Sequence, residues 1–176
     1  MIDPSTSVEG EDMEAYCTRR WGSSGWTHSL KSEGRKDGAH FANWKWWPHT
    51  LRAHQLILFG RDRHQVDTSK SKAALFRALY EEGENISQTE TLVKIGRERL
   101  GMDDPNLQKH LSNNEGSRQV LEEIEQGRRS YQIRGVPFFI IRGPAVDRPY
   151  GFSGAQSTDT FIELFEEVSG QEGDSS

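Results

Sequence analysis

Cysteine is almost absent from this sequence of 176 residues, which contains only Cys17. Because a disulfide needs two cysteines, none can form within the chain, and a C-x-x-C redox motif is missing for the same reason. A chain without a disulfide framework is typical of a reducing compartment, so we expect the protein in the cytoplasm. The cysteine count constrains a redox function more than any other feature of the composition.

Long apolar runs and an excess of basic charge are also missing. No uninterrupted apolar run exceeds four residues, as in Phe138–Ile141, whereas a membrane-spanning helix needs about 20. The first residues have neither the basic nor the apolar region of a secretory signal. Basic residues number 22 and acidic residues 27, a formal net charge of −5, which disfavours general nucleic-acid or polybasic membrane binding. We therefore expect neither a nucleic-acid nor a membrane partner.

Tryptophan, in contrast, is concentrated in one segment among basic side chains. The five residues are Trp21, Trp26, Trp44, Trp46 and Trp47. Aromatic rings interleaved with cations can stack nucleobases. The other interpretation is an aromatic wedge that packs an irregular loop onto neighbouring helices. The net negative charge of the chain favours packing over nucleotide binding.

From Thr50 to Tyr131 the apolar residues recur at the spacing of amphipathic helices, and no strand pattern interrupts them. Caps and stops divide this block into separate helices. We predict five helices: one after Thr50 that ends at Gly60, one capped by Thr68 or Ser69 that ends near Gly83, one after the capping box Ser87–Glu90 that ends at Gly101, one opened by Asp104 and Pro105 that runs through Leu111, and one from Asn113 or Asn114 to about Tyr131.

The pattern changes downstream of this block. The run Val136–Ile141 predicts a strand buried on both faces, and Pro149–Phe152 predicts a shorter second strand. Ser157 is the predicted cap of a final helix with apolar positions from Phe161 to Val168. A strand inside a sheet needs partners on both sides, and this sequence supplies one at most.

The six histidines lack the spacing of a zinc site, and no phosphate-binding or dinucleotide-binding loop occurs. The remaining motif is Arg134–Phe139, in which a proline opens a strand after a glycine. If the Val136–Pro137 bond is cis, the chain turns tightly and leaves the N–H and C=O of Val136 unpaired. An extended peptide or glutathione can then add there as an antiparallel strand. A trans proline would only begin the strand, and about 5% of such bonds are cis.

Three segments resemble the C-terminal part of the DsbA-like thioredoxin family: Gly135–Phe139, then Ser153–Gln156, then the helix around Phe161. The resemblance is to the FrnE-like branch, near the 2-hydroxychromene-2-carboxylate isomerases and the kappa-class glutathione transferases. Upstream, Trp47–His54 resembles the family's P-N-T-x-x-A-H segment, with His49 in place of the asparagine. The resemblance covers about residues 2–168.

This resemblance implies an α/β fold that is thioredoxin-like but incomplete. Family members begin with a strand, a helix that carries C-x-x-C and a second strand, and this chain starts where that unit would end. The absent unit would also supply the missing partner of the strand at Phe138. We expect a loose N-terminal segment (1–12), a large helical insertion (13–131), a C-terminal ββα unit (132–168) and a disordered tail (169–176).

The resemblance implies thiol–disulfide exchange as the parent activity, with a peptide or protein thiol or disulfide, or glutathione, as substrate. Gly135, Val136 and Pro137 would form the substrate-binding edge, whereas Cys17 matches no catalytic position of the family. We therefore expect no catalytic residue, metal or cofactor in this chain, and no activity from it alone. The alternative is a non-catalytic peptide-binding or assembly module whose exposed sheet edge pairs with another chain or a second copy. The sequence does not separate that module from a truncated gene product.

Overall fold

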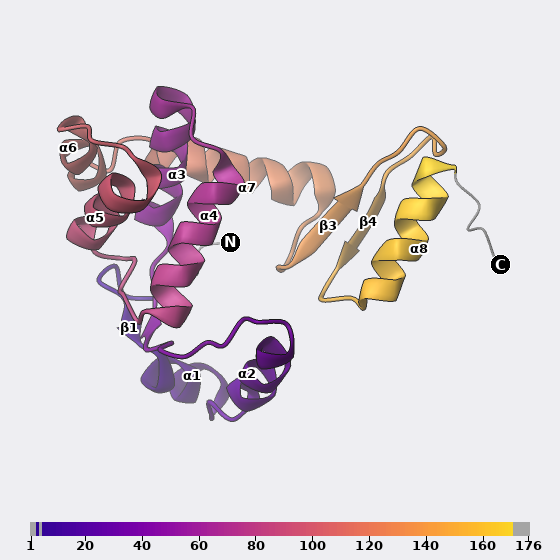
Figure 1. Cartoon of the computed structure of the whole chain (residues 1–176), viewed down its shortest axis with the longest axis horizontal. Helices are drawn as coiled ribbons and strands as arrows, with labels where there is room; N and C mark the ends of the chain where they lie inside the picture. Colours follow the sequence, from indigo (N-terminus) through magenta and orange to yellow (C-terminus); the bar gives the residue numbers. More distant parts are fainter. Residues whose placement is uncertain (1–2, 4, 171–176) are drawn as a thin grey trace. The chain divides into compact units, whose positions relative to one another are not determined.

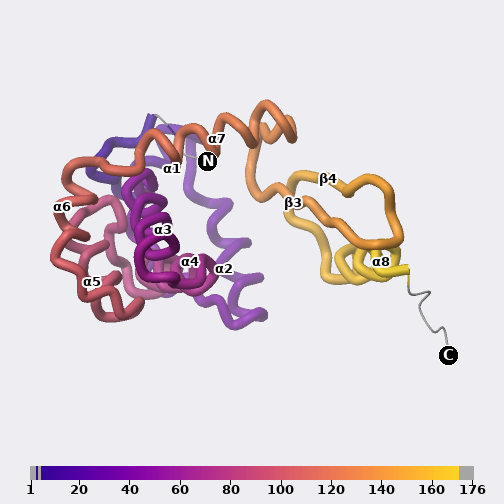
Figure 2. Tube along the Cα trace, turned by 90° about the horizontal axis from the view of Figure 1, so that it is seen from above, coloured from indigo at the N-terminus to yellow at the C-terminus, as the bar shows by residue number. Residues whose placement is uncertain are grey.

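The computed structural model describes residue 3 and residues 5–170. The chain divides into two compact units, with the boundary between Leu121 and Glu122 (Figure 1, Figure 2). We call the part that ends at Leu121 the helical unit and the part that begins at Glu122 the C-terminal unit. Since the boundary lies inside α7 (Ser117–Tyr131), this helix contributes residues to both units.

The helical unit combines a short two-stranded sheet with a group of packed helices (Figure 1). The two strands are antiparallel, with Glu11 opposite Trp47. Apolar side chains such as Leu56, Leu92 and Ile95 are fully buried between the helices and form the core. In chain order, the elements before α7 are β1 (Glu11–Asp12), α1 (Met13–Trp21), α2 (Trp26–Lys36), β2 (Trp46–Trp47), α3 (Leu51–His64), α4 (Thr68–Phe76), the π-helical turn η1 (Arg77–Glu81), α5 (Thr89–Leu100) and α6 (Asn106–Ser112).

The prediction of an irregular loop for the tryptophan-rich segment is wrong, because much of the segment is helical. The carboxylate of Asp12 accepts a first-turn N–H at 2.9 Å and so begins α1, and Gly22 ends the helix in the left-handed conformation (φ 80°). The packing role of the tryptophans is confirmed for two of them. Trp44 is 7% exposed, and the ring of Trp47 stacks on Tyr16 at a centroid distance of 4.4 Å.

The segment 1–12, expected to be loose, makes defined contacts through its described residues. Glu11 pairs with β2 and forms an ion pair of 2.7 Å with Arg19 of α1. The hydroxyl of Tyr16 donates a hydrogen bond to the carboxylate of Asp3, and Thr6 is buried. These contacts replace the loose arrangement expected there. Residues 1, 2, 4 and 171–176 of the two expected end segments lie outside the described residues.

α3 continues through Gly60, so the prediction that the helix ends at this glycine is wrong. A Cβ at position 60 would lie 3.1 Å from the Sδ of Met102. The absence of a side chain therefore serves close packing rather than helix termination. The helix ends at His64, and Gln65 adopts the left-handed conformation there (φ 53°).

The end of α5 lies where the sequence predicts it, whereas the N-cap residue of α4 differs from the prediction. Gly101 ends α5 in the left-handed conformation, as predicted. α4 is capped by Asp67 rather than by Thr68 or Ser69, because the Asp67 carboxylate accepts the N–H of Ser69 at 2.8 Å.

Among the described residues, every helix falls short of the length and apolar content that crossing a membrane requires.

The C-terminal unit contains the remainder of α7, the antiparallel strands β3 (Phe138–Ile141) and β4 (Tyr150–Ser153), and α8 (Thr158–Ser169). α8 covers one face of this sheet (Figure 1), where the ring of Phe161 lies 4.8 Å from that of Phe139. Ser157 caps α8 as predicted, since its Oγ accepts the N–H of Thr160 at 3.2 Å.

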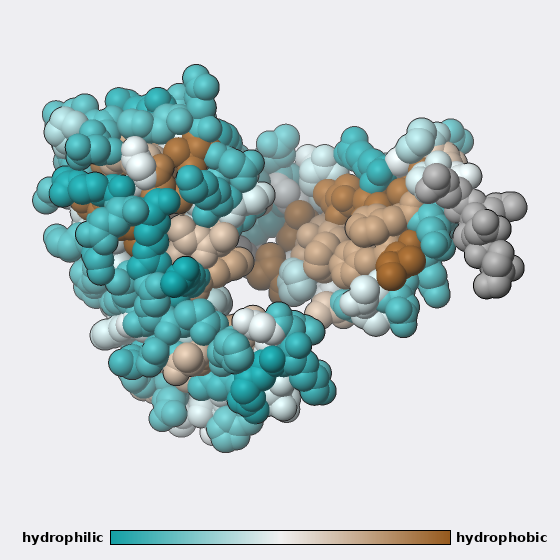
Figure 3. All heavy atoms as spheres, in the orientation of Figure 1, coloured by the Kyte–Doolittle hydropathy of each residue, from teal (hydrophilic) through white to brown (hydrophobic). Residues whose placement is uncertain are grey.

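The prediction that β3 is buried on both faces is wrong. Ile140 is 37% exposed, and Val136, which lies just before the strand, is 65% exposed. Within the described residues β3 pairs with β4 alone, so no further strand continues the sheet beyond it. Ile162 and Phe165 of α8 are also exposed, and Figure 3 shows apolar residues at the surface of this part of the chain. The C-terminal unit therefore leaves apolar groups and one β3 edge uncovered.

Candidate functional site

The three residues predicted to bind substrate lie together in the turn between α7 and β3. Gly135, Val136 and Pro137 are all exposed to solvent, and the Val136–Pro137 peptide bond is cis. The C=O of Pro137 accepts the N–H of Gly154 at 2.9 Å, which ties the turn to the end of β4. Within the described part of the chain, Val136 takes part in no backbone hydrogen bond. Its N–H and C=O are therefore accessible to a ligand.

The register of the sheet determines which backbone groups of β3 are free. Because Gly154 bonds to Pro137 and the strands are antiparallel, Phe139 and Ile141 occupy the hydrogen-bonded positions opposite β4. The backbone groups of Phe138 and Ile140 then point away from β4. This chain thus offers two separate backbone features in the C-terminal unit: the single residue Val136 and the outer edge of β3.

Cys17 lies inside α1 of the helical unit and is fully buried. Its thiol contacts the Sδ of Met13 at 3.7 Å. Burial raises the pKa of the Cys17 thiol, and the carboxylates of Asp12 and Glu14 raise it further. A reactive thiolate needs the opposite environment, with a nearby positive charge or a free helix N-terminus. The geometry gives Cys17 a packing role.

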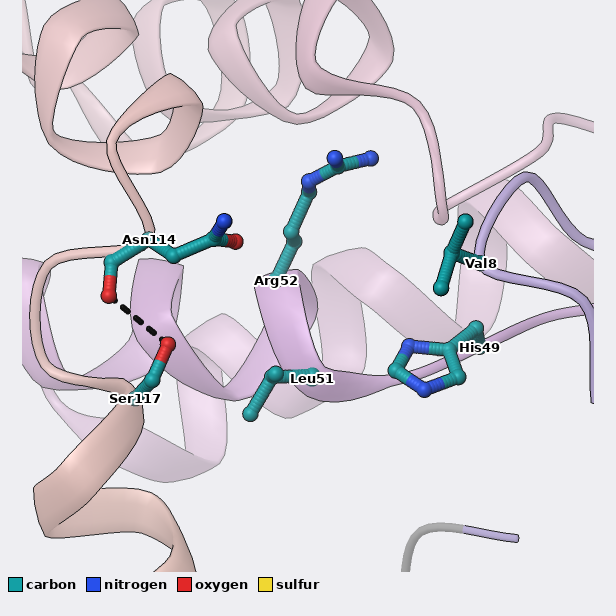
Figure 4. Close-up of a pocket in the computed structure, with 6 residues that line it drawn as sticks. All are labelled: Val8, His49, Leu51, Arg52, Asn114 and Ser117. Carbon is teal, nitrogen blue, oxygen red and sulfur yellow. Dashed lines mark hydrogen bonds between the residues drawn. The ribbon is translucent and has the colours of Figure 1, made fainter. Parts of the chain in front are cut away.

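A cavity of about 430 Å³ opens at the start of α3 (Figure 4). His49, where the resemblance leads us to expect an asparagine, lies on its wall. Sequence reasoning missed the other lining residues, because they come from distant segments and no local pattern connects them. Among the described residues, the lining consists of Val8, His49, Leu51, Arg52, Asn114 and Ser117.

Ser87 holds one wall of this cavity, so its predicted role in a capping box for α5 is wrong. Its Oγ accepts the backbone N–H of His49 at 2.9 Å, and its C=O accepts Nη1 of Arg52 at 3.1 Å. Its own N–H donates to the Oδ1 of Asn85 at 3.0 Å. α5 begins after Gln88 without a side-chain cap. A serine that bonds across the fold is not available to cap its own helix.

A second hydrogen-bonded chain holds the opposite wall. Nε2 of Gln55 donates to the Oγ of Ser117 at 2.7 Å, and this hydroxyl donates to the C=O of Asn114 at 2.7 Å. Asn114 adopts a positive φ of 53° and precedes Gly116, also at positive φ, so α7 begins at Ser117 and not at Asn113 or Asn114 as predicted. The turn places the Asn114 side chain toward the cavity (Figure 4).

Arg52 is the charged side chain in the described lining of the cavity. Within the described residues, Arg52 has no carboxylate partner in an ion pair, and its one polar contact is the C=O of Ser87. In the same part of the chain, no group of three or more His, Cys, Asp or Glu side chains is arranged to hold a metal ion. The arrangement suits an anion better than a cation.

Comparison with known proteins gives one family for this chain. No curated protein matches it. Residues 39–166 match the DSBA-like thioredoxin domain, an interval that includes both His49 and the turn at Gly135–Pro137. Because the matched interval is well over half of the sequence, the chain belongs to the family of DSBA-like thioredoxin domains.

Proposed function

We propose that this chain is a FrnE-like member of its family and binds thiol or disulfide peptides, or glutathione, at Gly135, Val136 and Pro137. Family membership supports thiol–disulfide exchange as the parent chemistry. The observation that carries the proposal is Val136, which is 65% exposed and has no backbone hydrogen bond within the described residues. An extended substrate can bond to both of its backbone groups as a short antiparallel strand.

The chain has no thiol suited to the chemistry itself. Exchange requires a thiolate that attacks one sulfur of a disulfide while the other sulfur leaves as a thiolate. Cys17 is the only cysteine, and its buried, acid-flanked thiol is not activated. The attacking and resolving thiols would therefore come from glutathione or from polypeptide outside these 176 residues. On this proposal, the chain binds substrate in a reducing compartment, the cytoplasm, and has no turnover of its own.

The corresponding fold proposal is a thioredoxin-like domain that lacks the C-x-x-C unit. Residues 13–131 would be a helical insertion and residues 132–168 the ββα end of the domain. The outer edge of β3, with its outward-pointing groups at Phe138 and Ile140, is where a further strand would pair. This assignment explains why the chain's longest strand-forming run has one partner among the described residues.

Insulin reduction tests the catalytic part of the proposal. Wild type and Cys17→Ser, each with dithiothreitol or glutathione, should reduce insulin at the rate of the reagent alone. Cys17→Ala is a second variant, because a buried hydroxyl can destabilise the fold. Robust turnover that both substitutions abolish would contradict the assignment of Cys17 to packing. Robust turnover that survives them would contradict the absence of activity and favour glutathione as the nucleophile.

The second candidate function is a non-catalytic assembly module. The outward backbone groups of Phe138 and Ile140 and the exposed side chain of Ile140 favour it, since an uncovered strand edge is a template for pairing with another chain. Its partner would be a second copy or a polypeptide that supplies the missing strand. Binding at Val136 and pairing along β3 use different groups, so the two functions are separable by substitution.

A further inference from the structure

The cavity at the start of α3 contains an arginine without an acidic partner. The guanidinium of Arg52 has five N–H donors, and one hydrogen bond, to the C=O of Ser87, is present. Within the described residues no carboxylate pairs with it. Guanidinium groups bind carboxylates through two parallel hydrogen bonds. Arg52 therefore retains the donors that an anionic ligand needs.

Neutral polar groups surround the same space. In Figure 4 the amide of Asn114 points toward the Arg52 side chain, and the His49 ring borders the cavity beside Val8. Neither the Asn114 amide nor the His49 imidazole has a hydrogen-bond partner within the described residues. α3 also begins here without a side-chain cap from Thr50, so first-turn N–H groups and the positive end of the helix dipole face this region.

The remaining walls are apolar. Val8 is 59% exposed, and Leu51 also lines the cavity. A ligand that covers these side chains would remove apolar surface from water. With one arginine and no lysine among the described lining residues, the cavity matches one negative charge rather than a phosphate dianion or a polyanion.

We propose that this cavity binds a small organic monocarboxylate, with the carboxylate on Arg52 and Asn114 and an apolar body against Val8 and Leu51. The site lies entirely in the helical unit and goes beyond the proposed function, which rests on residues of the C-terminal unit. Binding here does not depend on a thiol, a disulfide or the turn at Val136.

Calorimetric titration of the full chain with benzoate tests the site, with the neutral isostere benzamide and inorganic phosphate as comparison ligands. Benzoate should bind saturably, and benzamide should bind about tenfold or more weakly because it lacks the charge. Phosphate should also bind more weakly than benzoate, because it gains nothing from the apolar walls. Equal binding of benzoate and benzamide, tighter binding of phosphate, or no benzoate binding would overturn the proposal.

Two substitutions locate the ligand. Arg52→Met should weaken benzoate binding about tenfold or more. Asn114→Gly should weaken it several-fold and keep the turn, because glycine readily adopts the positive φ of 53° found there. The matched control is Arg35→Met on the exposed face of α2, which should bind benzoate like wild type. If Arg52→Met fails to fold, Asn114→Gly still decides the question. Wild-type affinity in either cavity variant, or an equal loss in Arg35→Met, would place the ligand elsewhere.

Discussion

The backbone N–H of His49 donates a hydrogen bond of 2.9 Å to the hydroxyl of Ser87, and this bond joins the start of α3 to the turn before α5. Ser87 is fully buried and also accepts Arg52 at its carbonyl. Ser87 therefore positions both His49, which supplies the imidazole of the cavity, and Arg52, which supplies its positive charge. The local sequence around Ser87 gives no indication of this role, because its partners lie more than thirty residues away.

Substitution of Ser87 by alanine should destabilise the helical unit. The variant leaves the N–H of His49 without its acceptor in a partly buried position, so we expect the free energy of unfolding to fall by about 1–2 kcal/mol. Urea unfolding followed by circular dichroism measures the change. Ser29→Ala, on an exposed position of α2, is the matched control and should change stability by less than about 0.5 kcal/mol. If Ser87→Ala and Ser29→Ala were equally stable, the hydrogen bond from His49 to Ser87 would not stabilise the fold as we propose.

Local signals in the sequence predict several helix ends and one strand well. The Ser157 cap, the second strand in Pro149–Phe152 and the helix stop at Gly101 all depend on neighbours within a few residues. Gly60 and Ser87 are mispredicted for the opposite reason. One packs against Met102 and the other bonds to His49, and such contacts exist only once the chain has folded.

The two candidate sites also differ in how far the sequence predicts them. The turn at Gly135–Pro137 is one continuous motif, so its position before a strand is predictable from the sequence. The cavity at α3 unites Val8, Arg52 and Asn114 from three separate segments. Of its described lining, only His49 is singled out in the sequence, by the resemblance of Trp47–His54 to a family segment. No spacing rule connects residues brought together by tertiary packing alone.

The thiol of Cys17 should be almost unreactive in the folded protein. It is fully buried, and its raised pKa keeps it protonated at neutral pH. We expect its reaction with a chromogenic disulfide reagent to be slower than that of the urea-unfolded chain by on the order of 100-fold. Raising the pH from 7 to 9 should accelerate the unfolded chain more than the native one. Rapid native labelling would contradict the buried environment of Cys17 and reopen a chemical role for it.

Asp3 and Tyr16 should make stability depend on pH at both extremes. The hydrogen bond from Tyr16 lowers the pKa of Asp3 to about 2. A carboxylate whose folded pKa is depressed stabilises the fold above its unfolded value, about 3.9, and loses that contribution as the pH falls toward 2. Burial, followed by the bond to Asp3, raises the pKa of Tyr16. Its contribution is therefore present below pH about 10 and is lost as the pH rises through the folded value.

Asp3→Asn isolates the acidic part of this dependence. The difference in unfolding free energy between wild type and Asp3→Asn should be on the order of 1 kcal/mol at pH 6 and should shrink between pH 4 and 2. Urea titrations at each pH measure it. A difference that stays constant over this range would show that the Asp3 carboxylate gains nothing from Tyr16.

The uncovered edge of β3 should promote self-association. We expect concentration-dependent sedimentation for wild type, and Ile140→Lys should weaken association about tenfold, because a lysine at a strand edge opposes pairing with another strand. Ile162→Lys, on the exposed face of α8, is the matched control and should associate like wild type. A stronger effect of Ile162→Lys would assign the contact to α8. A monomeric wild type at all concentrations would contradict an assembly role for β3.

The most direct test of the central claim is a nuclear magnetic resonance titration of the full chain with glutathione and with glutathione disulfide. If substrate adds as a strand at the turn, the Val136 amide should shift saturably and exchange with solvent more slowly, whereas the amides of Phe139 and Ile141, which already pair with β4, should change little. The account predicts this response in Cys17→Ser as well as in wild type. An unchanged Val136 amide at saturating concentrations of both ligands would contradict substrate binding at Gly135, Val136 and Pro137.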